Sequence, residues 1–238
     1  MLTAILWGGL ASAALLVGYL LARRGLSNRS VGMVMGFGAG ALLSAIAYEL
    51  VPESALGGGR MAVAFLIGAL TFFGADWLID RGGGKDRKDI TGGNIGSGSA
   101  IFIGTLLDNI PESIILGMSL AVGGSINVAF LAAVFVSNLP EGVAGTVNME
   151  AAGRSRRNIF WMWFVLVVIS AIFAGVGYAV ITLLPAASGR FAQAFAAGAM
   201  LTMLADAMMP EAFEHGGKLV GILTVMGFLV ASVLSFAN

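Results

Sequence analysis

Long apolar stretches separated by short polar segments alternate along the whole chain. Eight of these stretches come close to the roughly 20 residues that an α-helix needs to cross the hydrocarbon core of a bilayer. They cover residues 2–22, 31–51, 59–79, 99–121, 127–149, 159–184, 189–210 and 217–237. The pattern predicts an all-α fold: a polytopic membrane helical bundle of eight transmembrane helices, forming a single transmembrane domain over residues 1–238.

The longest polar segment lies between the third and fourth predicted helices. Residues 80–98 are rich in glycine and charge, which is typical of a flexible linker. Their glycines do not form a phosphate-binding motif, because neither G-x-x-x-x-G-K-[ST] nor G-x-G-x-x-G follows a strand here. We therefore expect a flexible cytoplasmic linker without a nucleotide site.

The composition agrees with a chain that is nearly all membrane. Hydrophobic residues make up 58% and charged residues 11% of the chain, whereas a soluble domain has about 25% charged residues. The mean hydropathy is +0.93. There is no cysteine and a single histidine, His215. Disulfides and thiolate metal sites are thereby excluded, and a metal ion would need oxygen, nitrogen or methionine sulfur ligands.

The basic residues predict the orientation of the helices. Eleven of the thirteen Lys and Arg residues fall in alternate loops, and the opposite face has only Arg60 and Arg190. The positive-inside rule places the basic loops in the cytoplasm and both termini outside, in a multi-pass protein of the cell (inner or plasma) membrane. The N-terminus lacks a basic region and a cleavage site, so we expect the first helix to be retained. The expected surroundings are a lipid bilayer and not a nucleic acid.

Four tryptophans lie near predicted helix ends. Trp7 falls toward the outer face, and Trp77, Trp161 and Trp163 fall toward the inner one. Tryptophan is enriched at membrane interfaces, where its ring meets the lipid headgroups. All four are therefore expected to be interfacial anchors.

Two internal repeats organise the chain. Residues 108–113 (DNIPES) recur as 137–142 (SNLPEG), and residues 37–44 (FGAGALLS) recur as 195–202 (FAAGAMLT). The second match continues to a Pro-Glu pair at 52 and at 210. Matching helices cross in opposite directions, so these are inverted repeats in a 3+2+3 arrangement, as in secondary transporters. Tight packing alone can explain shared small residues, but packing does not require a carboxylate.

Acidic residues occur inside the predicted helices, and Lys and Arg do not occur deep within them. The acids are Glu49, Asp76, Asp108, Glu112, Glu141 and Asp206. A charge at the centre of a membrane helix costs about 2.5–3.5 kcal/mol on insertion scales, so such residues generally face a cavity and have a functional partner. A cation is the partner that the sequence suggests.

Each copy of the Asn-x-Pro-Glu motif gathers polar side chains on one helix face. The candidate metal ligands are Asp108, Asn109 and Glu112 on the fourth helix, and Ser137, Asn138 and Glu141 on the fifth. A spacing of three or four residues aligns them, and each motif begins about 15 Å into its helix, near the membrane centre. Carboxylate, amide and hydroxyl oxygens together suit one or two divalent ions. Alternatively, the two asparagines and the two glutamates only hold helices together by hydrogen bonds, and the Ser137 hydroxyl bonds its own backbone.

These paired motifs, with eight helices and a variable loop after the third, resemble the ZIP (Zrt/Irt-like) metal transporters over essentially the whole chain. The resemblance implies uptake of zinc, iron, manganese or cadmium into the cytoplasm through a mononuclear or binuclear site on helices four and five. Zinc is the expected cargo, and no other cofactor is implied. The resemblance also implies a homodimer, in which helices one, four, five and six move against two, three, seven and eight.

The chain departs from the family pattern at the site itself. Asp108 stands where the family usually has His, Ser113 replaces Gly, and Ser137 and Asn138 occupy positions where a His or Gln and an acid are usual. The sixth helix has no acid. The pattern is therefore closer to a mononuclear site, with Asp108, Glu112 and Glu141 as principal ligands. An all-oxygen set favours manganese more than a mixed set does, although zinc also accepts carboxylates.

Other residues suggest a pathway to and from this site. Glu49 is expected near the outer entrance and Asp206 toward the inner exit, with the repeat-equivalent Ser44 and Thr202 at mid-depth. Asp76 and Glu53, like Glu211 and Glu214, are expected at hydrated helix ends. His215 is expected in an exposed loop. Packing is the expected role of Met200, Met203, Met208 and Met209.

Two other functions use the same acidic residues. A proton-coupled carrier of an organic solute would use the carboxylates to bind protons. An intramembrane hydrolase would need H-E-x-x-H, a Ser with a His in the helices, or suitably flanked catalytic aspartates, and the sequence has none of these. We therefore expect a transporter and not an enzyme.

Overall fold

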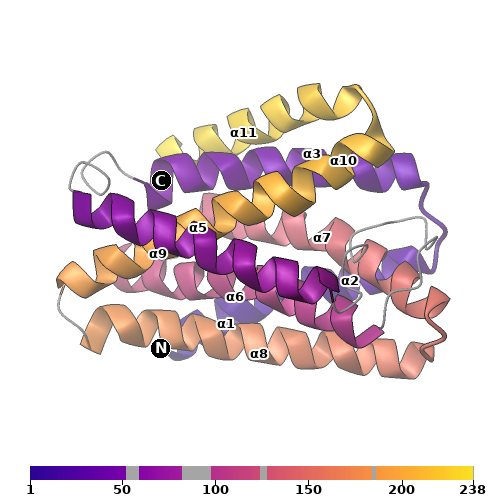
Figure 1. Cartoon of the computed structure of the whole chain (residues 1–238), viewed down its shortest axis with the longest axis horizontal. Coiled ribbons are helices and arrows are strands. Elements are labelled where there is room, and N and C mark those ends of the chain that lie inside the picture. The colour runs from indigo at the N-terminus through magenta and orange to yellow at the C-terminus, as the bar shows by residue number, and fades with distance from the viewer. Residues whose placement is uncertain (52–58, 82–97, 124–127, 184–185, 238) are drawn as a thin grey trace.

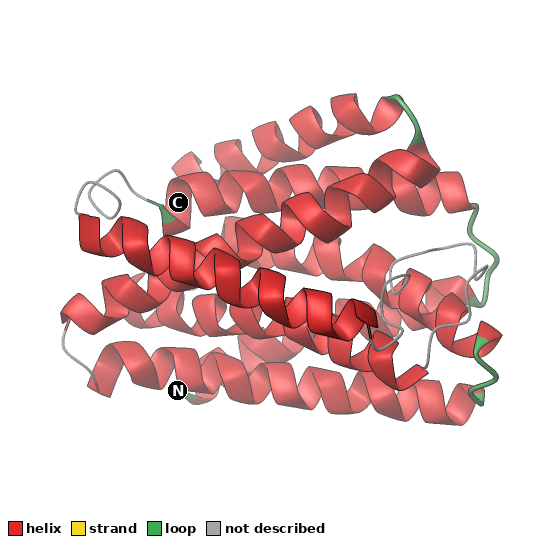
Figure 2. Cartoon of the chain, viewed as in Figure 1, coloured by secondary structure: helices red, strands yellow, loops and turns green. Residues whose placement is uncertain are grey.

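In a computed structural model of the chain, residues 1–51, 59–81, 98–123, 128–183 and 186–237 are described. All regular secondary structure in these ranges is helical (Figure 2). The first half contains α1 (Leu2–Ser12), α2 (Ala14–Ala22), α3 (Asn28–Ala45), the π-helical turn η1 (Ile46–Leu50), α5 (Gly59–Ile79) and α6 (Gly98–Gly123). The second half contains α7 (Val128–Ala151), α8 (Arg156–Leu183), α9 (Ala186–Met203), the π-helical turn η3 (Leu204–Met208), α10 (Met209–Gly216) and α11 (Leu219–Ala237).

Within the described ranges, eight helical stretches are long and apolar enough to cross a membrane. Each overlaps one of the eight predicted spans, with ends that differ by a few residues, and the predicted all-α polytopic bundle is confirmed. The predicted linker at 80–98 lies mostly outside the described residues. At its start Asp80 and Arg81 are still helical, and at its end Gly98 already belongs to α6.

The surface of the bundle is apolar along several helices. Leu66 and Leu70 of α5 are 57% and 60% exposed, and Ile222 and Leu229 of α11 are 62% and 56% exposed. Such an extensive exposed apolar surface is suited to lipid and not to water. The architecture is that of a multi-pass membrane protein.

The helix pairs of one repeat match those of the other. α3 packs along α11 and α9 along α5, while α6 packs along α8 and α2 along α7. Figure 1 shows α3 and α11 together on one side of the bundle and α8 on the opposite side. In the inverted repeat the second span (α3) corresponds to the seventh (α9), and the third span (α5) corresponds to the eighth (α11). The contact between α3 and α11 in one repeat is therefore equivalent to the contact between α9 and α5 in the other.

Equivalent glycines make equivalent contacts in these two pairs. A Cβ atom on Gly40 would collide with the Thr224 carbonyl of α11, and one on Gly198 would collide with the Phe65 carbonyl of α5. Both glycines let two helix backbones touch, which is the usual role of small residues between membrane helices. For Gly40 and Gly198, close packing is thus a sufficient explanation of the repeat.

The second and seventh spans each change from α-helix to a π-helical turn at equivalent positions. The alignment that pairs Phe37 with Phe195 also pairs η1 with η3. In η1 the Val51 amide bonds the Ile46 carbonyl, and in η3 the Met209 amide bonds the Leu204 carbonyl, so both turns contain i→i+5 bonds. In the sequence a proline follows each turn by two residues. Proline removes an amide donor and crowds the preceding turn, which favours this wider register.

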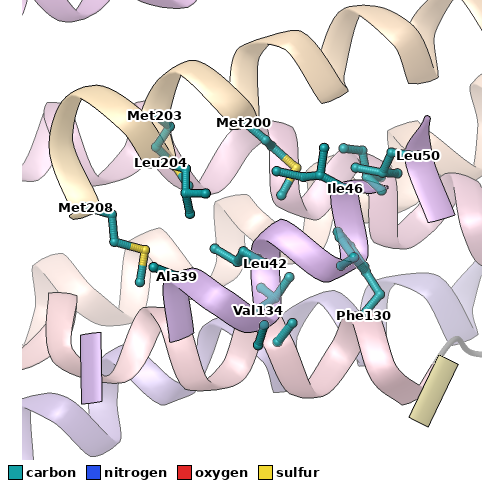
Figure 3. Packing of buried hydrophobic residues seen from close by; sticks show 14 of the residues in the cluster. Ala39, Leu42, Ile46, Leu50, Phe130, Val134, Met200, Met203, Leu204 and Met208 are labelled. Atoms are coloured by element: carbon teal, nitrogen blue, oxygen red, sulfur yellow. The ribbon is translucent and has the colours of Figure 1, made fainter. Parts of the chain in front are cut away.

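Buried side chains of α3, α7 and α9 form the largest apolar cluster of the bundle. Figure 3 shows Leu42 of α3 and Ile46 of η1 lying between Val134 and Phe130 of α7 and the methionines of α9 and η3. Met200, Met203 and Met208 are all fully buried in this cluster, and Met209 packs against it. These contacts agree with the packing role predicted for the four methionines.

Candidate metal site

The two copies of the Asn-x-Pro-Glu motif lie in the middle of α6 and α7, which contact each other. Pro111 and Pro140 are both inside continuous helices. All six predicted ligands are buried: Asp108, Asn109 and Glu112 are each 1% exposed, Ser137 is 0%, Asn138 1% and Glu141 3% exposed. Spacings of three and four residues turn each set toward the interior, as the sequence predicts.

The acidic side chains of the motifs are buried without being gathered into one shell. In the part of the chain that the structure describes, no group of three or more His, Asp or Glu side chains is placed to hold a metal ion. Asp108, Glu112 and Glu141 therefore do not form a closed metal shell in this conformation. A closed shell would require α6 and α7 to shift, or these side chains to change rotamer.

Asn109 is fixed by two hydrogen bonds. Its Nδ2 donates to the Thr105 carbonyl one turn earlier at 3.1 Å, and its Oδ1 accepts from the Ser12 hydroxyl of α1 at 3.4 Å. Ser12 is itself buried and is the last residue of α1, just before the break at Ala13. The predicted alternative, an amide that holds helices together, thus describes Asn109.

Asn138 occupies the equivalent position on α7, and its amide is not satisfied. Neither Oδ1 nor Nδ2 has a hydrogen-bond partner among the described residues, although the side chain is 1% exposed. Leaving a buried polar group unsatisfied costs about 1–3 kcal/mol. An unused amide oxygen inside the bundle is suited to coordinate a cation without adding charge.

The Ser137 hydroxyl donates to the Val134 carbonyl of its own helix at 2.9 Å, which is the alternative that the sequence left open. The hydroxyl oxygen still has lone pairs for a further interaction. The backbone at Ser137 lies against Gly38 of α3. A Cβ atom on Gly38 would lie 3.0 Å from the Cα atom of Ser137 and 3.3 Å from the methyl carbon of Met208. α3 therefore contacts the motif of α7 at Gly38, close to Met208 of η3.

The residues predicted to line a pathway differ in burial and in hydrogen bonding. Ser44 is buried and shares a 2.9 Å hydrogen bond with Ser232 of α11, so its hydroxyl joins two packed helices. Thr202 donates to the Gly198 carbonyl of its own helix at 3.0 Å. Asp206 lies in η3 and is exposed. Glu49 belongs to η1, but its side chain, like the whole of Glu53, lies outside the described residues.

Two residues predicted at the surface, His215 and Asp76, are largely buried, and these predictions were wrong. His215 is in the last turn of α10, not in an exposed loop, and its side chain is 8% exposed. Its Nδ1 lies 3.1 Å from Oε1 of Glu211, whose side chain is only 16% exposed. Asp76 of α5 is 8% exposed. Glu214, by contrast, is exposed as predicted.

Trp163 is also not an interfacial anchor. It is fully buried, and its Nε1 donates to the Thr146 hydroxyl of α7 at 2.9 Å. Thr146 in turn donates to the Gly142 carbonyl, one residue after Glu141. Trp163 thereby fixes the half of α7 that follows the motif. Trp77 and Trp161 are about half exposed, at 46% and 50%, as an anchor requires, whereas Trp7 is partly buried.

Sequence reasoning missed a further buried amide, Asn148 of α7, which is 1% exposed. It follows Glu141 by seven residues, or two helical turns, and therefore extends the polar face of the motif toward the end of α7. That spacing is the signal that would have identified it.

Comparison with known proteins adds no further information on this site. No protein-family model matches the chain, and no curated protein matches it.

Proposed function

We propose that this protein carries divalent transition-metal ions across a membrane toward the cytoplasm by alternating access, in the manner of the ZIP transporters that its motifs resemble. The proposal is supported chiefly by one observation. Both copies of an acidic, amide-containing motif are buried at the middle of neighbouring membrane-spanning helices, and in one copy the Asn138 amide has no hydrogen-bond partner among the described residues. Packing of helices requires neither feature.

The residues of the two motifs have different roles in this proposal. Asp108, Glu112 and Glu141 supply the negative charge that replaces the hydration shell of the cation. Asn138 supplies a neutral oxygen, and Ser137 completes the shell with a lone pair. Asn109 is held by Thr105 of its own helix, joins α6 to α1 through Ser12, and is not a direct ligand.

Alternating access gives a role to the open arrangement of the carboxylates. Metal capture draws the acidic faces of α6 and α7 together, and release separates them again. Pro111 and Pro140 each remove one backbone hydrogen bond beside the acids, which makes both helices easier to bend at the site. The π-helical turns η1 and η3 provide matching flexible points in the second and seventh spans.

The donor set bears on which ion is carried. All proposed ligands are oxygens, and oxygen ligands suit manganese while still accepting zinc. We propose zinc as the main cargo and manganese as the closest competitor. We further propose that the protein resides in the cell membrane as a homodimer, with its arginine-rich loops in the cytoplasm. No enzymatic activity is proposed.

Uptake of radiolabelled zinc and manganese into proteoliposomes tests the proposal. Glu112→Gln is expected to lower uptake of both ions by at least about tenfold, the smaller end of the effect of perturbing a metal site. Glu214→Gln is the matched control, because Glu214 is exposed on α10 and outside both motifs.

A parallel thermal-unfolding measurement separates the alternatives. A metal transporter is expected to be stabilised by its ion, and Glu112→Gln is expected to remove that stabilisation. A carrier of an organic solute, or a hydrolase, would show no metal-dependent shift. Unchanged metal uptake by both Glu112→Gln and Asp108→Ala would disprove the proposal.

A further inference from the structure

The first two membrane spans are consecutive in the chain but hardly contact each other. α2 and α3 each pack along α7 instead. Between them lies a recess of about 150 Å³. Its wall includes Leu21 and Leu26 from the end of α2 and the following loop, Val31 and Val34 from α3, and Leu139 and Pro140 from α7.

A close contact between α2 and α7 explains why the recess forms between α2 and α3. A Cβ atom on Gly18 would lie 2.5 Å from the Leu139 carbonyl oxygen, and one on Gly142 would lie 2.5 Å from that of Leu15. The two backbones therefore touch at these glycines, which holds α2 against α7. Leu21 follows Gly18 by almost one turn, and α3 approaches α7 from another side. The apolar side chains beyond the crossing are thus left uncovered.

Three arginines lie within three residues in sequence of Leu21, Leu26 or Ser30, which line the recess. Arg23 and Arg24 follow the last residue of α2, Arg29 lies in the first turn of α3, and all three are exposed. Leu26, which lines the recess, stands between them in sequence. The Ser27 hydroxyl accepts a 3.1 Å hydrogen bond from the Ser30 amide and caps α3, which fixes the base of this loop.

An apolar recess suits the acyl chain of a lipid, and nearby arginines suit an anionic headgroup. Clusters of basic residues at the membrane surface attract anionic lipid headgroups, by about 1 kcal/mol per Lys or Arg. Arginine also binds phosphate through paired N–H groups. The recess of about 150 Å³ is too small to hold a helix, whose diameter with side chains is about 10–12 Å, whereas an acyl chain is thinner.

We propose that this recess holds an acyl chain of an anionic phospholipid, with the lipid phosphate bound by Arg23, Arg24 and Arg29. The chain of this lipid lies against Pro140, which directly precedes Glu141. The bound lipid therefore contacts α7 at the proline of the motif. The site does not depend on which solute the protein carries.

Native mass spectrometry of the full chain, extracted into detergent with equal amounts of phosphatidylglycerol and phosphatidylcholine of identical chains, tests the proposal. The expected result is one retained phosphatidylglycerol per chain. Val34→Trp fills the recess from a residue that is 38% exposed and is expected to abolish retention. Arg29→Gln is expected to weaken binding about fivefold, as expected for one fewer basic residue at an anionic lipid.

Matched controls change the same residue types elsewhere. Leu66→Trp places a tryptophan on the lipid-facing side of α5, and Arg81→Gln removes an exposed arginine after α5. Both are expected to retain the lipid as the native chain does. If Val34→Trp fails to unfold cooperatively, Leu26→Trp, at a lining residue that is 40% exposed, replaces it. Retention by the tryptophan variant, or equal retention of phosphatidylcholine, would overturn the proposal.

Discussion

The two Asn-x-Pro-Glu motifs align in sequence without a gap, but their asparagines have different surroundings. Asn109 of α6 is bonded to Thr105 and to Ser12 of α1. Asn138 of α7 is equally buried and has no hydrogen-bond partner among the described residues. The repeat thus places both asparagines at equivalent buried positions but does not give them equivalent hydrogen-bond partners. One copy stabilises the bundle, and the other is left with binding capacity.

The first position of the motif shows the same division. On α6 it is the carboxylate of Asp108, and on α7 it is the hydroxyl of Ser137, which donates to its own helix. α6 therefore contributes charge there, and α7 contributes a neutral oxygen. A pair of helices with unequal donors can bind one ion strongly without placing a fourth carboxylate in the membrane interior.

Removing the charge at the first position tests this difference most strongly. Two unit charges about 4 Å apart interact by roughly 4 kcal/mol at the dielectric typical of such sites. We therefore expect Asp108→Asn to weaken metal binding by about a hundredfold or more, as measured by isothermal titration calorimetry in detergent. Ser137→Ala changes the equivalent position of α7 and is expected to change affinity by less than about threefold, because that hydroxyl is a weak ligand. Equal losses in the two variants would contradict the unequal roles of the helices.

The two asparagines should respond in opposite ways to the same substitution. Asn138→Leu removes an unsatisfied buried amide, so we expect the metal-free protein to unfold at a higher temperature, by a gain of about 1–3 kcal/mol. Asn109→Leu removes two hydrogen bonds and is expected to destabilise by a similar amount. Metal affinity should fall about tenfold in Asn138→Leu and remain close to native in Asn109→Leu.

Thermal unfolding with and without zinc measures both quantities in one experiment. Destabilisation of the metal-free protein by Asn138→Leu would show that its amide is satisfied after all. A larger loss of affinity from Asn109→Leu than from Asn138→Leu would reverse the assignment of the ligand.

The sequence predicts what depends on period and length. Apolar stretches of membrane-spanning length gave the eight helices, and the spacing of Asp108, Asn109 and Glu112 placed them correctly on one buried face. The Pro-Glu pairs at 52 and 210 marked matching interruptions, next to which η1 and η3 are found. Each of these features is encoded within a few turns of one helix.

The sequence does not predict what depends on distant partners. One of the two bonds that distinguish Asn109 from Asn138 comes from Ser12, which is 97 residues away along the chain. Trp163 is buried because Thr146, on another helix, accepts its N–H group. His215 is the exception, because its partner Glu211 is four residues earlier on the same helix. Extending the seventh helix beyond Pro210 would have revealed that pair.

The smallest expected effect concerns the bond that makes Asn109 different from Asn138. The Ser12 hydroxyl lies 3.4 Å from Asn109 Oδ1, which is long for a hydrogen bond between these groups. Ser12→Ala is therefore expected to destabilise the protein by about 0.5–1 kcal/mol, at the lower end for such bonds. Because Asn109 is a positioning residue, metal affinity should be nearly unchanged.

A double-mutant cycle with Asn109→Ala isolates the contribution of this bond, since both side chains are buried and in contact. We expect a coupling energy of about 0.5 kcal/mol, the lower limit for contacting residues. Ser170→Ala is the matched control, because Ser170 on α8 is also 1% exposed and its hydroxyl has no hydrogen-bond partner among the described residues. That variant should show no coupling with Asn109→Ala. If the coupling of Ser12 is also zero, the Ser12 bond does not hold Asn109, and the difference between the two motifs must then come from Thr105 alone.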